Sequence, residues 1–145
     1  MKVGGQTAEL VHFENAHTDG DTFVFWPAAN VISTGDIVSS ASYPNIDVAT
    51  GGGIDGMIAG TDFVIAHADD KTKIVPGHGP VTDKKGVIAY RAMLKTARDR
   101  IAAAKKKGMS EDDVANGPCW PIWTRNGNPR AARRRRASTG WSMNR

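Results

Sequence analysis

Hydrophobic and polar residues alternate along the first third of the chain in a way that predicts short β-strands. Residues 9–14 (ELVHFE) alternate loosely, residues 22–26 (TFVFW) are aromatic and β-branched, and residues 31–34 (VIST) form a third apolar run. Polar segments rich in turn-forming residues separate these runs at positions 17–21 and 27–30. We therefore expect consecutive antiparallel strands with short connections.

The middle of the chain mixes a loop, a helix and a strand. The polar, glycine-rich residues 37–53 predict a long loop, and residues 54–67 carry apolar side chains near helical spacing. Residues 73–75 predict a short buried strand, which a rigid loop, residues 76–80 (PGHGP), follows.

A long helix is expected next, from Thr82 or Asp83 as its N-cap to about Lys107, with Gly108 as its stop. Its predicted apolar stripe consists of Val87, Ile88, Tyr90, Met93, Leu94, Ala97 and Ile101. A shorter helix is expected to open at Ser110 and to end before Pro118. The order of strands, then helix, strand and helix predicts a layered α/β (α+β) domain, with helices on one face of a mostly antiparallel sheet.

Charge divides the chain near Gly117. Residues 1–116 hold 12 Lys and Arg against 15 Asp and Glu, a net charge of −3, whereas residues 117–145 hold seven Arg and no acid. We therefore expect one domain over residues 1–116 and a basic tail over residues 117–145, either disordered or the product of a shifted reading frame. The arginine run at 133–136 would favour phosphate contacts, but nucleic-acid binding is the minor alternative.

The composition argues against a membrane span, a signal peptide and an internal disulfide. No apolar run approaches the roughly 18 residues that a membrane span needs, so no membrane association is expected. Residues 1–10 lack the apolar core of a signal peptide, which leaves a cytoplasmic location as the default. The single cysteine, Cys119, excludes an internal disulfide.

Three potential metal ligands lie at predicted junctions of strands and loops. His17 opens the segment HTDGD, Asp36 closes VISTGD, and His78 is centred in PGHGP. Imidazole and carboxylate groups are the ligands that a zinc site uses, and loops at the ends of strands can bring them together from distant positions. Each residue also has an ordinary structural interpretation, because loop histidines are mostly solvated and Gly-Asp pairs mostly form turns.

Longer segments around these residues resemble the metallo-β-lactamase superfamily. The pieces HTDGDTFVFWPAANVISTGD, YPNIDVATGGGIDGMI and TKIVPGHGPVTDKKGVIAYRAML are similar to a branch of zinc hydrolases of the quinoprotein-relay type. The resemblance covers about 85 residues, from His17 to about Arg100, in the family's order. It implies the C-terminal half of an αββα sandwich.

The resemblance also implies residue roles. His17 would bind the first zinc, His78 the second, and Asp36, the one catalytic residue expected, would reach the second zinc and bridge both. A zinc-bound hydroxide would then hydrolyse an ester, thioester or lactam-type bond, since zinc lowers the pKa of bound water to near 7. Asp19 and Asp21 are candidates for orienting His17 from behind.

Tyr43 and Asp47, in the loop over the expected site, are candidates for contact with a small-molecule substrate. The sequence departs from the family at one important point, because the motif His-x-His-x-Asp-His, which supplies four ligands, is absent. The other histidines, His12 and His67, lack its spacing, and we expect them to be structural.

A half sandwich would expose a sheet face that the other half normally covers. We therefore expect either a homo-oligomer that covers this face or poor stability, with zinc binding that is weak or partial. The alternative is a non-catalytic fragment or assembly module.

Overall fold

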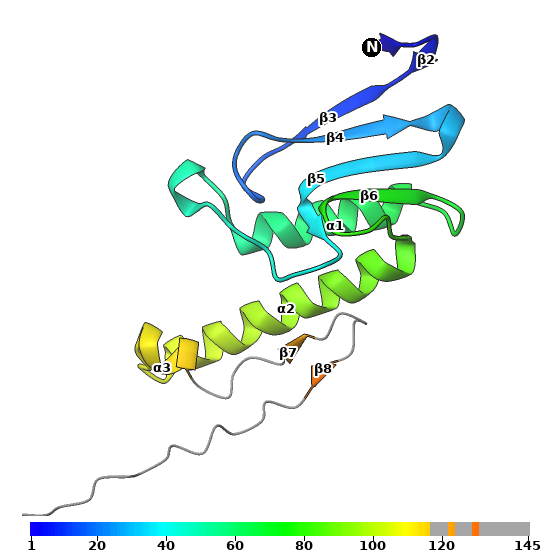
Figure 1. Ribbon diagram of the computed structural model, residues 1–145. Helices are drawn as coiled ribbons and strands as arrows, with labels where there is room; N and C mark the ends of the chain where they lie inside the picture. Colours follow the sequence, from blue (N-terminus) through cyan, green and yellow to red (C-terminus); the bar gives the residue numbers. More distant parts are fainter. Residues whose placement is uncertain (117–121, 124–128, 131–145) are drawn as a thin grey trace, which may run out of the picture.

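The fold is described from a computed structural model, which describes residues 1–116, 122–123 and 129–130 (Figure 1). Its strands are β1 (Lys2–Val3), β2 (Gln6–Thr7), β3 (Glu9–Phe13), β4 (Asp21–Trp26), β5 (Val31–Ser39), β6 (Lys73–His78), β7 (Ile122–Trp123) and β8 (Pro129–Arg130). Its helices are α1 (Ile54–His67), α2 (Lys84–Lys106) and α3 (Glu111–Asn116), with 3-10 turns at Pro27–Ala29 and Val48–Thr50. None of the described helices is both long and apolar enough to cross a membrane.

The main sheet has the order β3-β4-β5-β6, in which the first two pairings are antiparallel and the last is parallel. Both long helices lie on one side of this sheet, as Figure 1 shows. The predicted α+β class, with a mostly antiparallel sheet and helices on one face, is confirmed. The expected tail lies outside the described residues, except for the short pairing of β7 with β8.

Two strands are longer than the sequence predicts. We expected a strand to stop before Gly35, but β5 continues to Ser39 because Gly35 takes a φ of +52° and lets the strand bend. Likewise β6 runs to His78, so the predicted rigid loop at residues 76–80 is wrong in its first half. Pro76 is tolerated because β6 is the last strand of the sheet, where a missing main-chain donor costs little.

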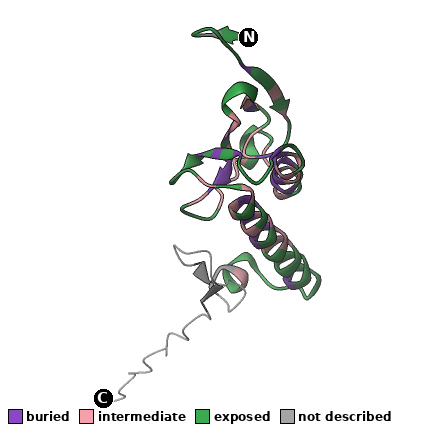
Figure 2. Ribbon diagram, turned by 90° about the vertical axis from the view of Figure 1, so that its right-hand side faces the viewer, coloured by how far each residue is buried: buried purple, intermediate pink, exposed green. Residues whose placement is uncertain are grey.

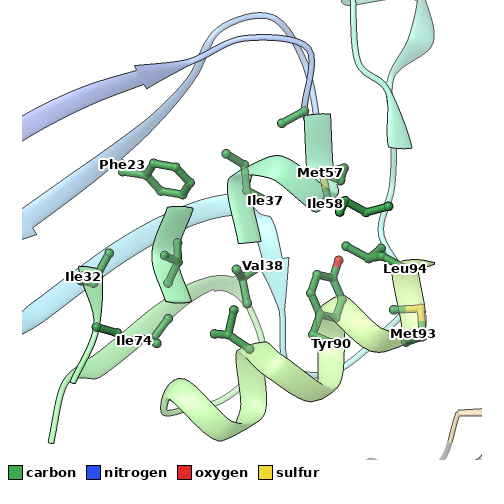
Figure 3. Packing of buried hydrophobic residues seen from close by; sticks show 14 residues of the cluster. Phe23, Ile32, Ile37, Val38, Met57, Ile58, Ile74, Tyr90, Met93 and Leu94 are labelled. Carbon is green, nitrogen blue, oxygen red and sulfur yellow. The ribbon is translucent and has the colours of Figure 1, made fainter. Parts of the chain in front are cut away.

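The core lies between the sheet and the helices. Alternation along β4 and β5 turns Phe23 and Ile32 toward the helices, where both are buried. They belong to one buried cluster with Met57 of α1 and Leu94 of α2, both of which are fully buried (Figure 3). Figure 2 shows that the hairpin of β1 and β2 stands outside this core.

Helix α2 buries a narrower stripe than predicted. Its cap is Asp83, whose carboxylate accepts a hydrogen bond of 2.8 Å from the main-chain N–H of Gly86. Val87 is fully buried, but Ile88 and Ile101 are 45% and 40% exposed. One position along a helix turns a side chain by about 100°, and this rotation carries Ile88 out of the core.

Gly56 allows the loop before β4 to lie against α1. A Cβ atom at Gly56 would lie 1.7 Å from the main-chain oxygen of Asn15. Replacing a helical glycine with alanine normally stabilises a protein by up to about 1 kcal/mol. We expect Gly56→Ala instead to destabilise it by about 1–3 kcal/mol, because the loop must move. Denaturant unfolding measures this change in the free energy of unfolding, and Ala59→Gly is the control for helix propensity alone. A gain in stability for Gly56→Ala would contradict the close packing of Gly56 against the loop.

Asp69 ties the turn after α1 to the turn before β5. The side-chain amide of Asn30, the main-chain N–H of Lys71 and the hydroxyl of Thr72 all donate to its carboxylate and lower its pKa to about 2. A depressed carboxylate pKa gives stability that is present above pH 3.8, the ordinary value, and is lost as the pH falls toward 2. The stability difference between wild type and Asp69→Asn should therefore shrink over this range. A difference that stays constant from pH 5 to pH 2 would contradict the account.

Candidate functional site

The structure brings together the three predicted metal ligands. Asp36 lies between two imidazoles: its Oδ1 is 3.2 Å from Nε2 of His78, and its Oδ2 is 3.8 Å from Nε2 of His17. These residues come from the bent part of β5, the end of β6 and the loop before β4. The three side chains therefore share one side of the domain, although more than 60 positions separate the two histidines in the sequence.

Glycines on neighbouring segments make this approach possible. A Cβ at Gly77 would lie 2.0 Å from Oδ1 of Asp36, so only glycine lets the carboxylate lie over β6. A Cβ at Gly52 would lie 2.3 Å from the main-chain oxygen of His17. The glycine that makes room for the His17 loop thus comes from another loop.

The loop that carries His17 is fixed by a second loop. The main-chain N–H of Asp47 donates to the oxygen of His17 at 2.9 Å, and the N–H of Asp19 donates to the oxygen of Thr50 at 2.9 Å. Asp47 also caps a 3-10 turn through its carboxylate, which accepts from the N–H of Ala49 at 3.0 Å. Asp47 therefore acts on the site by holding the His17 loop in place.

Asp21 lies behind His17. Its Oδ1 is 3.8 Å from Nδ1 of His17, on the side of the ring away from Asp36, and its Oδ2 accepts from the N–H of Thr18 at 2.8 Å. A negative group at Nδ1 favours the tautomer in which Nε2 is free to accept or to bind a cation. Asp19 instead lies beside the neighbouring loop, since a Cβ atom added at Gly51 would lie 3.0 Å from the Cβ of Asp19.

The other two histidines lie elsewhere. Nε2 of His12 is 2.6 Å from the main-chain oxygen of Asp19, and Nδ1 of His67 is 2.8 Å from the oxygen of Phe63. The ring of His67 also packs against that of Phe63, with 4.0 Å between centroids. Both histidines thus have structural partners, as the sequence led us to expect.

A hollow of about 250 Å³ opens beside Asp36. Its lining consists of His17, Asp36, Ser39, Ser42, Tyr43, Pro44, Asn45 and His78. Tyr43, a predicted substrate contact, is among them, whereas Asp19 and Asp47 are not. Ser39, Ser42 and Asn45 were not predicted, because Ser39 ends a strand that was expected to stop earlier and the other two lie in a loop without periodicity. The polar run around the end of β5 was a signal that could have found them.

A buried phenol lies beneath this side of the domain. Tyr90 of α2 is 3% exposed, and its hydroxyl has no hydrogen bond of good geometry among the described residues. Burial, with a smaller effect from the negative charge of Asp36, raises the pKa of Tyr90 well above its ordinary value. Tyr90 therefore stays a neutral phenol at physiological pH.

The donor types fit zinc, but their number does not complete a site. Two ligands of one tetrahedral zinc, each at about 2.1 Å, lie about 3.4 Å apart. The distances from the carboxylate oxygens of Asp36 to Nε2 of His78 and of His17, 3.2 Å and 3.8 Å, lie on either side of this value. Each histidine can therefore share a zinc ion with one oxygen of Asp36. A catalytic zinc takes three protein ligands, and no group of three or more suitable side chains that could hold a metal ion occurs within the described residues.

Solved structures of other proteins share the arrangement of the sheet and helices. VMB-1 aligns with 63% of this chain and 42% of its own, with 24% identity and a TM-score of 0.53. A metallo-β-lactamase from Pontibacter korlensis aligns with 66% of this chain and 44% of its own, with 18% identity and a TM-score of 0.56. This chain has part of the metallo-β-lactamase fold.

A variant of the sec-alkyl sulfatase PisA1 is also similar, with 16% identity and a TM-score of 0.66 over 79% of this chain and 19% of its own. The chain thus spans less than half the length of each of these metallo-β-lactamase-fold proteins. No protein-family model matches the sequence, and no curated protein matches it.

Proposed function

We propose that this chain supplies one half of the two-metal site of a metallo-β-lactamase-fold hydrolase. His17 would bind one zinc, His78 the other, and Asp36 both. The observation that carries the proposal is the carboxylate of Asp36 between two imidazoles, 3.2 Å and 3.8 Å away, at the edge of a polar hollow. The similarity of the fold to hydrolases of this class agrees with it.

The proposed reaction is hydrolysis of an ester, thioester or lactam-type bond. Zinc, when bound, would supply hydroxide at neutral pH by lowering the pKa of its water. The chain's own residues have separate tasks. Asp36 holds negative charge between the metal positions, and Asp21 orients the ring of His17. The hydroxyls of Ser39 and Ser42, 3.1 Å apart, hold the turn that lines the hollow, since Ser42 also donates to the main-chain oxygen of Tyr43.

The remaining ligands would come from outside the described residues. A complete site of this kind needs further donors on each metal, and the structures that share the fold are more than twice as long as the matched part. A separate chain or segment with those donors would complete it. Alone, this half should bind zinc weakly, because each metal would have only two protein ligands.

Zinc titration by calorimetry tests the proposal. Wild type should show two weak zinc-binding events. His17→Ala should weaken one of them about tenfold or more, and His78→Ala should weaken the other by a similar factor. His12→Ala is the matched control, because His12 has a main-chain partner outside the hollow. No zinc uptake at micromolar to millimolar metal, or uptake that depends on His12, would overturn the proposal.

A second candidate function is an assembly module, supported by the sheet face opposite the helices. Leu10 pairs with Val24 and Trp26 with Val31 across the strands, so these apolar side chains share that face, and Leu10 is 53% exposed. A second copy packed sheet to sheet would cover them, as two sheets stack in a sandwich. Light scattering should then give a dimer that Leu10→Lys dissociates; a monomer in both proteins would contradict it.

A further inference from the structure

A second, larger cavity lies beside the proposed metal site. It has a volume of about 670 Å³, within the range of about 300–1,000 Å³ that small-molecule sites occupy. Its lining is mostly apolar and includes Pro44, Ile54, Leu94, Ala97 and Ile101. The C-terminal half of α2 forms one wall, and the loop after β5 forms the other.

The two cavities are neighbours, because two residues line both of them. Tyr43 and Pro44 line both the polar hollow beside Asp36 and the apolar cavity. A molecule with one polar and one apolar end could therefore occupy both, with its polar end near Asp36 and its apolar end against Leu94 and Ile101. These shared residues place the larger cavity next to the chemistry of the smaller one.

Arg98, which lines the cavity together with a second basic residue, Lys105, is already paired with carboxylates. Nη1 of Arg98 lies 3.1 Å from Oδ1 of Asp55, and Nη2 lies 2.9 Å from Oδ1 of Asp99. These hydrogen bonds, first that with Asp55, raise the pKa of Arg98, so the guanidinium is already matched by carboxylates. What Arg98 offers the cavity is its aliphatic stem, which is how long basic side chains cover apolar surface.

We propose that this cavity binds the apolar acyl chain of a substrate ester whose carbonyl lies at Asp36. This inference deepens the proposed function and rests on it for the reactive end of the ligand. Hydrolysis would break the bond between the acyl carbon and the ester oxygen, with the oxygen of water going to the acid and a proton to the alcohol. The substrate class is therefore medium-chain acyl esters, with the chain length limited by the cavity.

Binding of methyl decanoate to the full chain tests this inference. Nile red would report the apolar cavity by fluorescence, and the ester would displace it. Each CH₂ removed from the acyl chain should weaken binding about fourfold. Ile101→Asp should weaken both ligands about tenfold or more, whereas Ile88→Asp should not. The two isoleucines are a matched pair, because both lie on α2 and are 40% and 45% exposed, but only Ile101 lines the cavity.

The outcomes separate this inference from the proposed function. If zinc binds through His17 and His78 but the ester does not displace Nile red, only the acyl site is wrong. If the ester binds but zinc does not, the metal site is wrong, and the cavity loses its assigned chemistry. Equal losses in Ile101→Asp and Ile88→Asp, or a dimer that Ile101→Asp dissociates, would also overturn the acyl site; the dimer would make this face an interface between copies.

Discussion

Replacing Asp36 with alanine should remove both zinc-binding events at once. The carboxylate is the group shared by the two proposed metal positions, since its two oxygens face Nε2 of His17 and Nε2 of His78. Each histidine alone would then be a single donor, which holds zinc far more weakly than a pair. Calorimetric titration should show no saturable uptake at zinc concentrations that saturate wild type.

Asp21→Asn is the matched control for the Asp36 variant, because it also removes a negative charge beside His17. Asp21 approaches Nδ1 of His17 at 3.8 Å and should change only the event that depends on His17. Its loss should weaken that event about 10–100-fold, as removal of an orienting partner does. Two intact binding events in Asp36→Ala would show that the carboxylate is not shared.

Replacing Phe23 with alanine should destabilise the domain by about 3–5 kcal/mol. Phe23 is fully buried and stacks on Phe63 of α1 with 5.5 Å between centroids, and it meets Phe13 edge-on at 5.5 Å. The substitution leaves a cavity where the sheet meets α1, and the neighbours can fill it only in part. Denaturant unfolding at equilibrium would measure the loss.

Val24→Ala is the control for the Phe23 variant, because the next residue of β4 points to the opposite face of the sheet. Val24 is half-buried, so its truncation should cost about 1 kcal/mol or less. Similar losses at Phe23 and Val24 would contradict the assignment of the two faces. A large loss at Val24 alone would indicate that the outer face is the covered one.

Most elements of the fold could be predicted, because the type and spacing of apolar residues indicate which side chains are buried in a strand or a helix. The aromatic and β-branched run in residues 22–26 and the helical spacing in residues 54–67 match β4 and α1 closely. The errors fall where glycine or proline was interpreted as a stop. Gly35 bends β5 without ending it, and Pro76 is accommodated at the sheet edge. A local pattern cannot distinguish a bulge from a turn, because the difference depends on which strand lies alongside.

The residues that meet at the candidate site could be predicted from the sequence, whereas the contacts that hold them in place could not. His17, Asp36 and His78 were found through motifs and a family resemblance, and the structure places them around one carboxylate. Gly52 lies against His17 and Gly77 against Asp36, and each pair is 35 or more residues apart in the sequence. No local sequence pattern predicts such contacts. The apolar cavity is likewise formed by α2 and a loop about 50 positions earlier.

The most direct test is the position of zinc in crystals of the full chain grown with the metal. Anomalous difference density at the zinc edge would locate each ion independently of any titration model. We predict two peaks, one within about 2.0–2.2 Å of His17 and Asp36 and one within the same distance of His78 and Asp36. Zinc bound only elsewhere, for example at His12 or His67, or no peak beside Asp36 at saturating zinc, would contradict the account.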